Sequence, residues 1–378
     1  MKFIFFFLVL ASVIGINYYV FIRGWQILPP FLWVKYFYVI LFWGLVASFF
    51  IRMFFGDNFS PQLSTLLSAA GFTWFIAVIY FALIALGVDL VRLLNYIFDF
   101  WPALIKDNLR SAAQITAAIS ISLVSIVLIY GNYKFNNPVI TRLDIPISKP
   151  LPNGELRIVL MSDIHLSSYI TGKDLDKYIS LANSQSPDIV MITGDIADRD
   201  LAPLKEWNVA ERFLKLKAKY GVYAVSGNHE FYGGQREQIY RYLRSAGMTL
   251  LLDSVAVAGG AIQIAGREDR TKSNRMSLNS LLSGLDRSLP LILLDHQPYN
   301  LDEAQREGVD LQLSGHTHNG QFWPVNLIVK LMYELSYGYK RKGDTHYYVT
   351  SGVGLWGPRI RIGTKSEIVV IDLKSSLR

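Results

Sequence analysis

The sequence predicts a membrane region of four helices followed by an α/β domain. Two observations lead to this division. Hydrophobic residues make up 51% of the 378 residues, and their excess lies before residue 135. Further along, short apolar runs alternate with helix-like stretches, and polar blocks follow several of these runs directly. We therefore assign residues 1–131 to the membrane, 132–154 to a linker and 155–378 to the α/β domain.

Four apolar segments are long enough to cross the hydrocarbon core, which requires about 20 residues. Trp25, Trp33 and Trp101 lie near the ends of these segments, as in the aromatic belts at membrane interfaces. No small-residue cleavage site follows the first segment, which favours an uncleaved anchor over a signal peptide. The predicted spans are residues 3–22, 36–55, 66–88 and 112–131.

Residues 89–100 mix charged residues with Leu, Ile and Phe. They can form an amphipathic helix on the membrane surface or continue the third helix. An even number of spans puts the N-terminus and the α/β domain on one side of the membrane. Lys and Arg near the spans are almost balanced between the sides, with a slight preference for an exported domain. The sequence thus predicts a multi-pass protein of the plasma (inner) membrane whose orientation stays open.

The segment 132–154 is rich in proline, which predicts an extended linker. The 37 basic and 30 acidic residues give a net charge of +7, of which residues 1–140 contribute +4 and the rest of the chain only +3. Such a weak basic excess in the α/β domain argues against nucleic acid as a partner. The basic residues Lys340, Arg341, Lys342, Arg359 and Arg361 can contact phosphate groups or form solvated loops. The absence of Cys excludes disulfides.

Polar residues follow five apolar runs that we expect to be strands, namely residues 157–162, 188–193, 222–226, 291–295 and 311–314. The carboxyl ends of strands in an open α/β sheet lie close together, so residues that are distant in sequence can meet there. Carboxylate, imidazole and amide ligands together suit Mn, Fe or Zn better than Ca. The residues expected to meet are Asp163, His165, Asp195, Asn228, His229, His296, His316 and His318.

The ordered motifs Asp-x-His, Gly-Asp-x-x-Asp, Gly-Asn-His-Glu, His and Gly-His-x-His resemble the calcineurin-like metallophosphoesterase superfamily over residues 156–373. The segment SGHTHNGQ at residues 314–321 is similar to a membrane-anchored bacterial subgroup. Some members of that subgroup cleave phosphodiester or pyrophosphate bonds in lipid precursors. Asn319 stands where the subgroup commonly has Gly, and Asn tolerates left-handed backbone angles.

The resemblance implies two mixed β-sheets flanked by helices in a four-layer sandwich, with two divalent metal ions, Mn being favoured. It assigns Asp163, His165 and His318 to the first ion, and Asp195 to both ions. It assigns Asn228, His296 and His316 to the second ion. His229 would act as general acid or orient the phosphoryl oxygens while hydroxide attacks phosphorus. Residues around this set would be Asp198, Arg199 and Glu230.

Several other residues have weaker signals. Asp295 precedes His296 and can either orient it or simply end a strand. Asp269 and Arg270 are further candidates for substrate contact, whereas we interpret His346 as structural. Gly259 and Gly260 separate two short apolar runs, which predicts a hairpin.

Together these features predict a membrane-anchored metallophosphoesterase that hydrolyses phosphodiester, pyrophosphate or phosphomonoester bonds. Anchoring next to lipid favours a lipid-linked substrate, with the bilayer as partner, and no protein partner can be inferred. Two alternatives stay open. One is an anchored phosphodiesterase or nuclease for soluble substrates, and the other is a non-catalytic, metal-binding membrane sensor.

Overall fold

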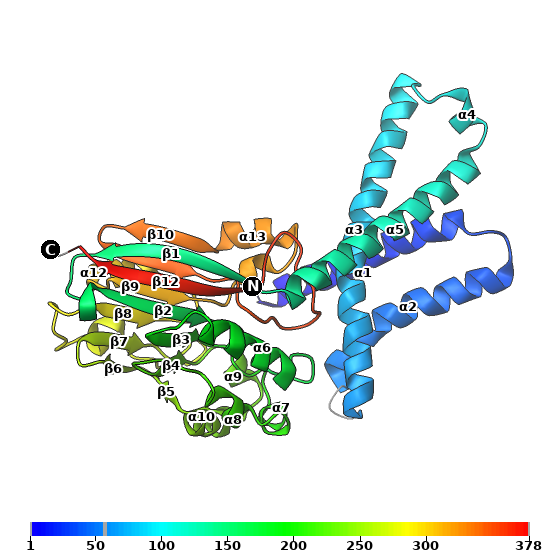
Figure 1. The fold of residues 1–378 in the computed structure, drawn as a ribbon. Coiled ribbons are helices and arrows are strands. Elements are labelled where there is room, and N and C mark those ends of the chain that lie inside the picture. The colour runs from blue at the N-terminus through cyan, green and yellow to red at the C-terminus, as the bar shows by residue number, and fades with distance from the viewer. Residues whose placement is uncertain (1, 56–58, 377–378) are drawn as a thin grey trace. The chain divides into compact units, whose positions relative to one another are not determined.

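The computed structural model describes residues 2–55 and 59–376, and the chain divides into two compact units (Figure 1). Unit 1 comprises Met1–Tyr130 and unit 2 comprises Gly131–Arg378. The helices of unit 1 are α1 (Lys2–Ile27), α2 (Leu32–Phe55), α3 (Pro61–Phe98), the short α4 (Ala103–Lys106) and α5 (Leu109–Asn136), which continues into unit 2.

Three helical segments among the described residues are long and apolar enough to cross a membrane. They are Leu32–Phe55, Gln62–Phe98 and Leu109–Asn136, and they contain the second, third and fourth predicted spans. The first predicted span, residues 3–22, lies within α1, which is not one of the three. A membrane crossing by α1 therefore stays a prediction.

Helix α3 decides between the two readings of residues 89–100. It continues without a break to Phe98, so these residues extend the third helix. The helix ends at Asp99, which has a left-handed backbone (φ 48°) and donates its N–H to the carbonyl of Asn95. Such a cap satisfies a carbonyl that has no partner inside the helix.

Small and polar residues bring the helices of unit 1 into contact. A Cβ atom on Gly71 of α3 would lie 2.5 Å from the backbone N of Phe49 in α2, so glycine allows the two helices to approach closely. The indole N–H of Trp74 donates to the side-chain oxygen of Asn17, at 3.1 Å, and links α3 to α1. An interhelical hydrogen bond of this kind is typical of packing in an apolar solvent.

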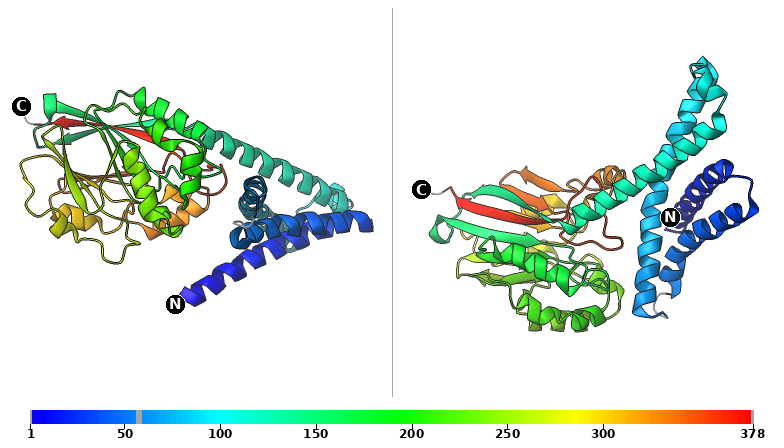
Figure 2. Two further views of the ribbon diagram at one scale, coloured as in Figure 1. Left: turned by 90° about the horizontal axis from the view of Figure 1, so that it is seen from below. Right: turned by 45° about the vertical axis from the view of Figure 1, so that its right-hand side comes forward.

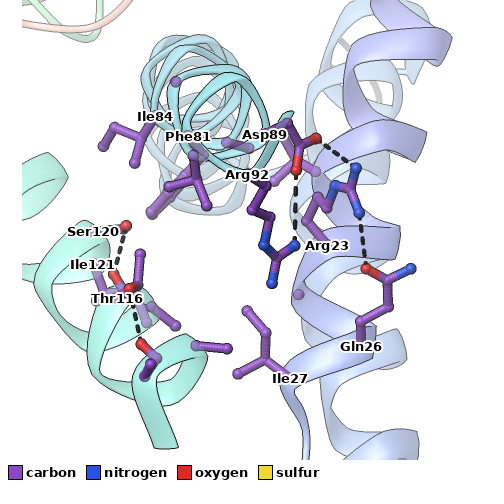
Figure 3. A pocket seen from close by; sticks show the side chains of 18 of the residues that line it. Arg23, Gln26, Ile27, Phe81, Ile84, Asp89, Arg92, Thr116, Ser120 and Ile121 are labelled. Carbon is purple, nitrogen blue, oxygen red and sulfur yellow. Dashed lines mark hydrogen bonds and ion pairs between the residues drawn. The ribbon is translucent and has the colours of Figure 1, made fainter. Parts of the chain in front are cut away.

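Unit 1 also contains an open-sided cavity of about 910 Å³, most of whose wall is apolar (Figure 3). Its charged residues are Arg23, Asp89 and Arg92. The Asp89 carboxylate lies 2.5 Å from Arg23 Nη2 and 3.8 Å from Arg92 Nη1, and it accepts a hydrogen bond from the Tyr19 hydroxyl. These charges are paired, as charged side chains within membrane regions usually are.

Unit 2 contains two mixed six-stranded sheets, as expected. The first has the order β1 (Val139–Ile147), β12 (Glu367–Ser375), β2 (Glu155–Met161), β3 (Ile189–Thr193), β4 (Val222–Val225) and β5 (Met248–Leu250). The second has the order β10 (Gly338–Lys342), β11 (Thr345–Val349), β9 (Leu311–Ser314), β8 (Leu291–Leu294), β7 (Ile262–Gly266) and β6 (Ser254–Ala258). Each sheet contains both parallel and antiparallel pairs.

The two sheets pack face to face and carry helices on their outer faces (Figures 1 and 2). Between them lies a core of strand residues such as Leu160, Met191, Leu294 and Leu313. The first sheet is covered by α6 (Gly172–Asn183), α8 (Val209–Phe213) and α10 (Arg236–Ser245), and the second by α11 (Leu278–Leu281) and α12 (Leu301–Arg306). The remaining helical turns are η2 (Pro152–Gly154), α7 (Leu201–Glu206), α9 (His229–Tyr232), η3 (His318–Gly320) and α13 (Val325–Met332).

The expectation of a linker at residues 132–154 is wrong for most of that segment. Helix α5 extends to Asn136, and Phe135 is buried in the core beneath the first sheet. Strand β1 follows and pairs in parallel with β12. Proline suggested a linker, but β1 is an edge strand, where a missing N–H at Pro146 is tolerated. The hairpin predicted at Gly259 and Gly260 does connect β6 to β7.

Candidate metal centre

The polar blocks meet at the carboxyl ends of the strands of both sheets. Asp163 follows β2, Asp195 follows β3 and Asn228 follows β4 in the first sheet. His296 follows β8 and His316 follows β9 in the second sheet. All eight of the predicted metal and catalytic residues lie in this region, and only His316 among them is more than slightly exposed. The convergence that the sequence predicts is present.

Among the residues that the structure describes, three overlapping groups of side chains are close enough to hold a metal ion. Within each group the ligand atoms lie within 4.8 Å of one another. The first group is Asp163, His165 and His318, the second is His165, Asp195 and His229, and the third is Asp195, His296 and His316. Asp195 and His165 each belong to two groups, so the three form one continuous cluster.

Distances between the ligand atoms show how tightly the cluster is assembled. The Nε2 atoms of His165 and His318 lie 3.3 Å apart, and His318 Nε2 lies 3.5 Å from Asp163 Oδ1. Asp195 Oδ2 lies 3.2 Å from His296 Nε2 and 3.6 Å from His165 Nε2. The amide oxygen of Asn228 lies 3.2 Å from His296 Nε2, which adds a neutral oxygen to the third group.

The backbone at these ligands adopts a conformation that L residues rarely occupy. Asp163, His165 and Asp195 have φ values of 53°, 53° and 50°, and His316 and His318 have 70° and 49°. Left-handed backbone at non-glycine residues costs free energy and is concentrated at functional sites. Asn319 is also left-handed, with a φ of 50°, which agrees with its tolerance of this conformation.

Glycines make room for the carboxylates. A Cβ atom on Gly227 would lie 2.1 Å from Asp195 Oδ1, and one on Gly315 would lie 2.3 Å from Asp163 Oδ2. Neither position can carry a side chain unless the site shifts. The glycine that precedes each of the Asn-His and His-Thr-His motifs is therefore required by the close approach of backbone to ligand.

Backbone contacts fix the orientation of the ligands. Nδ1 of His296 lies 2.6 Å from the carbonyl oxygen of Thr193 and must donate to it, which leaves Nε2 free to bind a metal. Asp163 accepts the backbone N–H of His316 at 3.0 Å. The carboxylate of Glu230 accepts three backbone N–H groups, those of Ile196, Ala197 and Gly227.

Electrostatics favour the metal-binding form of two histidines. Burial, together with the charge of His296, lowers the pKa of His316 to about 4. Burial and the charge of His165 hold the pKa of His318 well below its usual value. Both imidazoles are therefore neutral at pH 7, as a metal ligand must be. Nδ1 of His318 is buried without a hydrogen-bond partner among the described residues, and Nδ1 of His165 lies 3.8 Å from Asp198 Oδ1.

His229 lies at the side of this cluster and is paired with Asp198. Its Nδ1 is 2.6 Å from Asp198 Oδ1, and its ring centroid is 4.5 Å from that of His165. Burial opposes ionisation of Asp198, but the neighbouring imidazoles of His165 and His229 hold the pKa of this carboxyl well below its usual range. A carboxylate in this position fixes the ring of His229 and presents Nε2 as the atom for proton transfer.

Aromatic residues that the sequence analysis did not identify surround the cluster. Tyr232 and Trp356 lie beside His229, with ring centroids 5.2 Å and 6.4 Å away, and Tyr333 lies 6.2 Å from His316. The hydroxyl of Tyr232 also accepts a hydrogen bond from the side-chain amide nitrogen of Asn228, at 3.0 Å. Their only signal in the sequence is that Tyr232 follows the Asn-His-Glu motif closely.

Several weaker predictions are corrected by the contacts. Arg361 does not reach a phosphate-binding surface, because it is fully buried and its guanidinium donates to backbone carbonyls. Arg359 is paired with Asp174. Lys340 and Lys342 pair with Glu334, and Arg341 pairs with Asp344, so this basic cluster is largely neutralised.

The remaining candidates also have structural partners. Asp295 is buried between Arg267 and Arg275 and forms ion pairs with both. Asp269 accepts from Gln297 and Thr271, and the guanidinium of Arg270 lies over the ring of Tyr299. His346 contacts the hydroxyl of Tyr339 in β10, which agrees with a structural role.

Comparison with known proteins agrees with this geometry. Residues 156–320 match the family described as calcineurin-like phosphoesterase. The transmembrane protein with metallophosphoesterase domain of Danio rerio is 30% identical over 89% of this chain and 80% of its own length. An uncharacterized metallophosphoesterase of Campylobacter jejuni is 35% identical over 68% of this chain and 69% of its own. The uncharacterized metallophosphoesterase YkuE of Bacillus subtilis is 35% identical over 61% of this chain and 83% of its own.

The fold and the cluster of buried Asp and His residues define a hydrolase of phosphoric ester bonds. The chain belongs to the calcineurin-like metallophosphoesterase family. The family implies divalent metal ions, and the three groups of ligand atoms fit that requirement.

Proposed function

We propose that this protein is a membrane-anchored phosphoesterase with two metal ions, Mn being favoured, that cleaves phosphodiester, pyrophosphate or phosphomonoester bonds. The observation that carries the proposal is the single buried cluster in which Asp195 is shared between ligand groups. We assign Asp163, His165 and His318 to one ion, and Asn228, His296 and His316 to the other. Asp195, which belongs to two of the ligand groups, would be shared by both ions. When bound, the ions lower the pKa of water and offset negative charge on the phosphoryl oxygens.

We propose that the protein is held in the membrane by four spans, with α1 as the first. Membrane anchoring is supported by the three candidate spans among the described residues. It is also supported by relatives from Danio rerio and Bos taurus that are named as transmembrane proteins. The last candidate span ends at Asn136, and β1 begins at Val139. So short a connection keeps the hydrolase close to the lipid, which favours an amphiphilic phosphate ester as substrate. A plasma-membrane location is part of the proposal.

In this proposal His229 protonates the leaving oxygen. Its Nδ1 is engaged by Asp198, so its Nε2 carries the transferable proton, and the backbone N–H of His229 donates to Asp195 Oδ1 at 2.9 Å. The two contacts fix the ring relative to the metal ligands. Asp198 acts as a positioning residue, because it orients His229 without reaching the substrate itself.

The test uses the full chain, loaded with Mn, and a pair of substrates with different leaving groups. His229→Gln is expected to slow hydrolysis of an alkyl phosphodiester by about 10²–10⁴-fold, because an alkoxide leaves poorly without a proton donor. Hydrolysis of the matching p-nitrophenyl diester is expected to fall much less, because nitrophenolate leaves without protonation. The measurement is kcat for both substrates, with an alkyl and a nitrophenyl monoester assayed in parallel.

Asp198→Asn serves as the graded variant in this series. It keeps the shape of the side chain but loses the charge, so the same leaving-group pattern should appear with a smaller loss. Equal losses of kcat for both leaving groups in His229→Gln would contradict the assignment of a proton donor. They would instead favour a role for His229 in orienting the phosphoryl oxygens.

Metal binding at pH 7 is expected to release protons. Burial lowers the pKa of His296, but the adjacent Asp195 carboxylate outweighs burial and raises this pKa well above its usual value. The metal-free imidazolium must lose its Nε2 proton before it can bind an ion. Calorimetric titration with Mn in buffers of different ionisation enthalpy should show net release of about one proton or more. The release should decrease as the pH rises, because His296 is then already neutral, and an enthalpy independent of buffer at pH 7 would contradict it.

A further inference from the structure

Helix α13 carries an exposed apolar face that no core of unit 2 requires. Its residues are VNLIVKLM, and none of them is buried. Leu327, Ile328, Leu331 and Met332 are 50%, 58%, 89% and 60% exposed, and the preceding Trp323 is also exposed. Within each of two sets, positions 323, 327 and 331 and positions 328 and 332, successive residues are four apart and lie above one another along the helix. The two sets are adjacent and form one stripe. A contiguous exposed apolar stripe of this kind usually marks an interaction surface.

Contacts within unit 2 connect α13 to the end of a candidate membrane span. The backbone N–H of Trp323 donates to the carbonyl of Ile362 at 2.8 Å. Ile362 in turn packs on the last turns of α5, where a Cβ atom on Gly131 would lie 2.8 Å from its side chain. Gly131 belongs to the candidate span Leu109–Asn136. Ile362 is thus the one packed residue between the start of α13 and the last turns of α5. We propose that α5 leaves the bilayer at these turns.

The same helix borders the candidate metal centre. His318 lies in η3, directly before the segment that leads into α13, and Tyr333 follows the last residue of α13. The ring of Tyr333 lies 6.2 Å from that of His316. In Figure 1, α13 lies at the end of unit 2 where the strands deliver the ligands. The exposed Trp356 lies beside the same site, because its ring is 6.4 Å from that of His229.

We propose that the stripe formed by Trp323, Leu327, Ile328, Leu331 and Met332 docks into the lipid surface beside α5. A short amphipathic helix with an apolar stripe and a flanking cation lies in the interfacial region of a bilayer, and Lys330 supplies that cation. Trp323 and Trp356 are of the residue type that anchors at this depth. Lipid is the occupant because the contact with α5 holds the stripe next to the membrane.

Docking of α13 affects which substrates can reach the site, and this part of the inference rests on the proposed function. Docking of α13 places the aromatic residues around the metal ligands at the height of the lipid headgroups. A phosphate ester whose apolar part stays in the bilayer can then present its phosphorus to the site. The docking itself does not depend on turnover, so it can be tested separately.

The test is a depth measurement on the full chain in phospholipid nanodiscs that contain one copy each. The chain has no Cys, so a single introduced Cys carries the only environment-sensitive fluorophore. Leu331→Cys and Ile328→Cys report on the stripe. Leu214→Cys is the matched control, because Leu214 is 62% exposed and lies at the end of α8, on the outer face of the other sheet. Lipids with a nitroxide near the headgroup serve as quencher.

Docking predicts severalfold stronger quenching and a blue-shifted emission at positions 331 and 328 than at position 214. Equal, weak quenching at all three positions would overturn the proposal. A label at position 331 that is shielded from water but not quenched by the nitroxide lipids would also overturn it, in favour of contact with protein. An active enzyme with unquenched labels refutes docking alone, whereas quenched labels in a chain without turnover refute only the proposed function.

Discussion

Asp195→Asn is expected to lower kcat/KM for phosphate ester hydrolysis by at least about 10³-fold, which corresponds to about 4 kcal/mol of transition-state stabilisation. The Asp195 carboxylate is the group on which the candidate metal centre depends most. One oxygen lies 3.2 Å and 3.6 Å from Nε2 of His296 and His165, and the other accepts the N–H of His229. A neutral amide cannot bridge two cations, although it fills the same volume.

The electrostatics of Asp195 support so large an effect. Burial opposes its ionisation, but the charge and hydrogen bond of His296 hold the pKa of Asp195 well below its usual range. Its negative charge is therefore present at every pH at which the enzyme would work. Removing that charge leaves nearby cations, whether imidazolium or metal, without a counter-ion in a buried site.

The measurement is turnover of a chromogenic phosphodiester by the Mn-loaded full chain, with bound metal determined on the same samples. Asp372→Asn is the matched control, because Asp372 lies in β12 and pairs with Arg157, away from the ligands. It should keep turnover close to that of the unaltered protein. If Asp195→Asn retained more than a tenth of the wild-type kcat/KM, Asp195 would not be the bridging ligand.

The sequence was sufficient to predict the candidate site because each ligand follows a strand of strongly apolar residues. One residue separates each of Asp163, Asp195 and His296 from the buried strand before it, and parallel strands bring their carboxyl ends together. Such a signal is local, since an apolar run and the polar residue that ends it are neighbours in the chain. Convergence then follows from the topology of the sheets.

Features that depend on distant partners were not predicted. Strand β1 looks like a linker because Pro146 and its neighbours favour extended, unpaired chain, and its partner β12 begins more than 200 residues later. The continuation of α3 past Asp89 was left open for a similar reason. Asp89 is accommodated in an apolar environment because it has polar partners, and two of these, Arg23 and Tyr19, belong to another helix.

Arg361 shows the same limit for a single residue. Its sequence context suggested a phosphate contact, but its side chain is 0% exposed and lies beneath the metal ligands. The guanidinium donates to the carbonyls of Ser351, Gly352 and Gly354 at 2.7, 3.2 and 2.6 Å, and to that of His318 at 3.0 Å. A glycine-rich turn has carbonyls that no strand satisfies, and this is the signal by which a buried donor could have been inferred.

Arg361→Met is accordingly expected to destabilise the protein strongly. The variant removes the donor of the Ser351 and Gly354 carbonyls, whereas the carbonyls of His318 and Gly352 each keep a backbone N–H donor. A loss of about 3–5 kcal/mol is expected when a buried, hydrogen-bonded charge is removed. Burial lowers the pKa of Arg361 only to about 10, so the unaltered side chain is charged at pH 7 and donates through both of its terminal nitrogens. For a domain of this size the midpoint of thermal unfolding should fall by roughly 10 °C.

Thermal unfolding of the full chain in detergent, with a second measurement of bound metal, tests this expectation against two further variants. Arg341→Met changes an exposed arginine whose partner is Asp344, and its midpoint should stay within about 1 °C, because exposed ion pairs contribute little. Arg361→Lys keeps the charge but cannot span the four carbonyls. Its unfolding midpoint should therefore lie between those of Arg361→Met and Arg341→Met. Because the carbonyl of His318 is one of the acceptors, Arg361→Met should also bind metal more weakly. If Arg361→Met had an unfolding midpoint and a metal content like those of Arg341→Met, the buried guanidinium would not be what holds the ligand loops together.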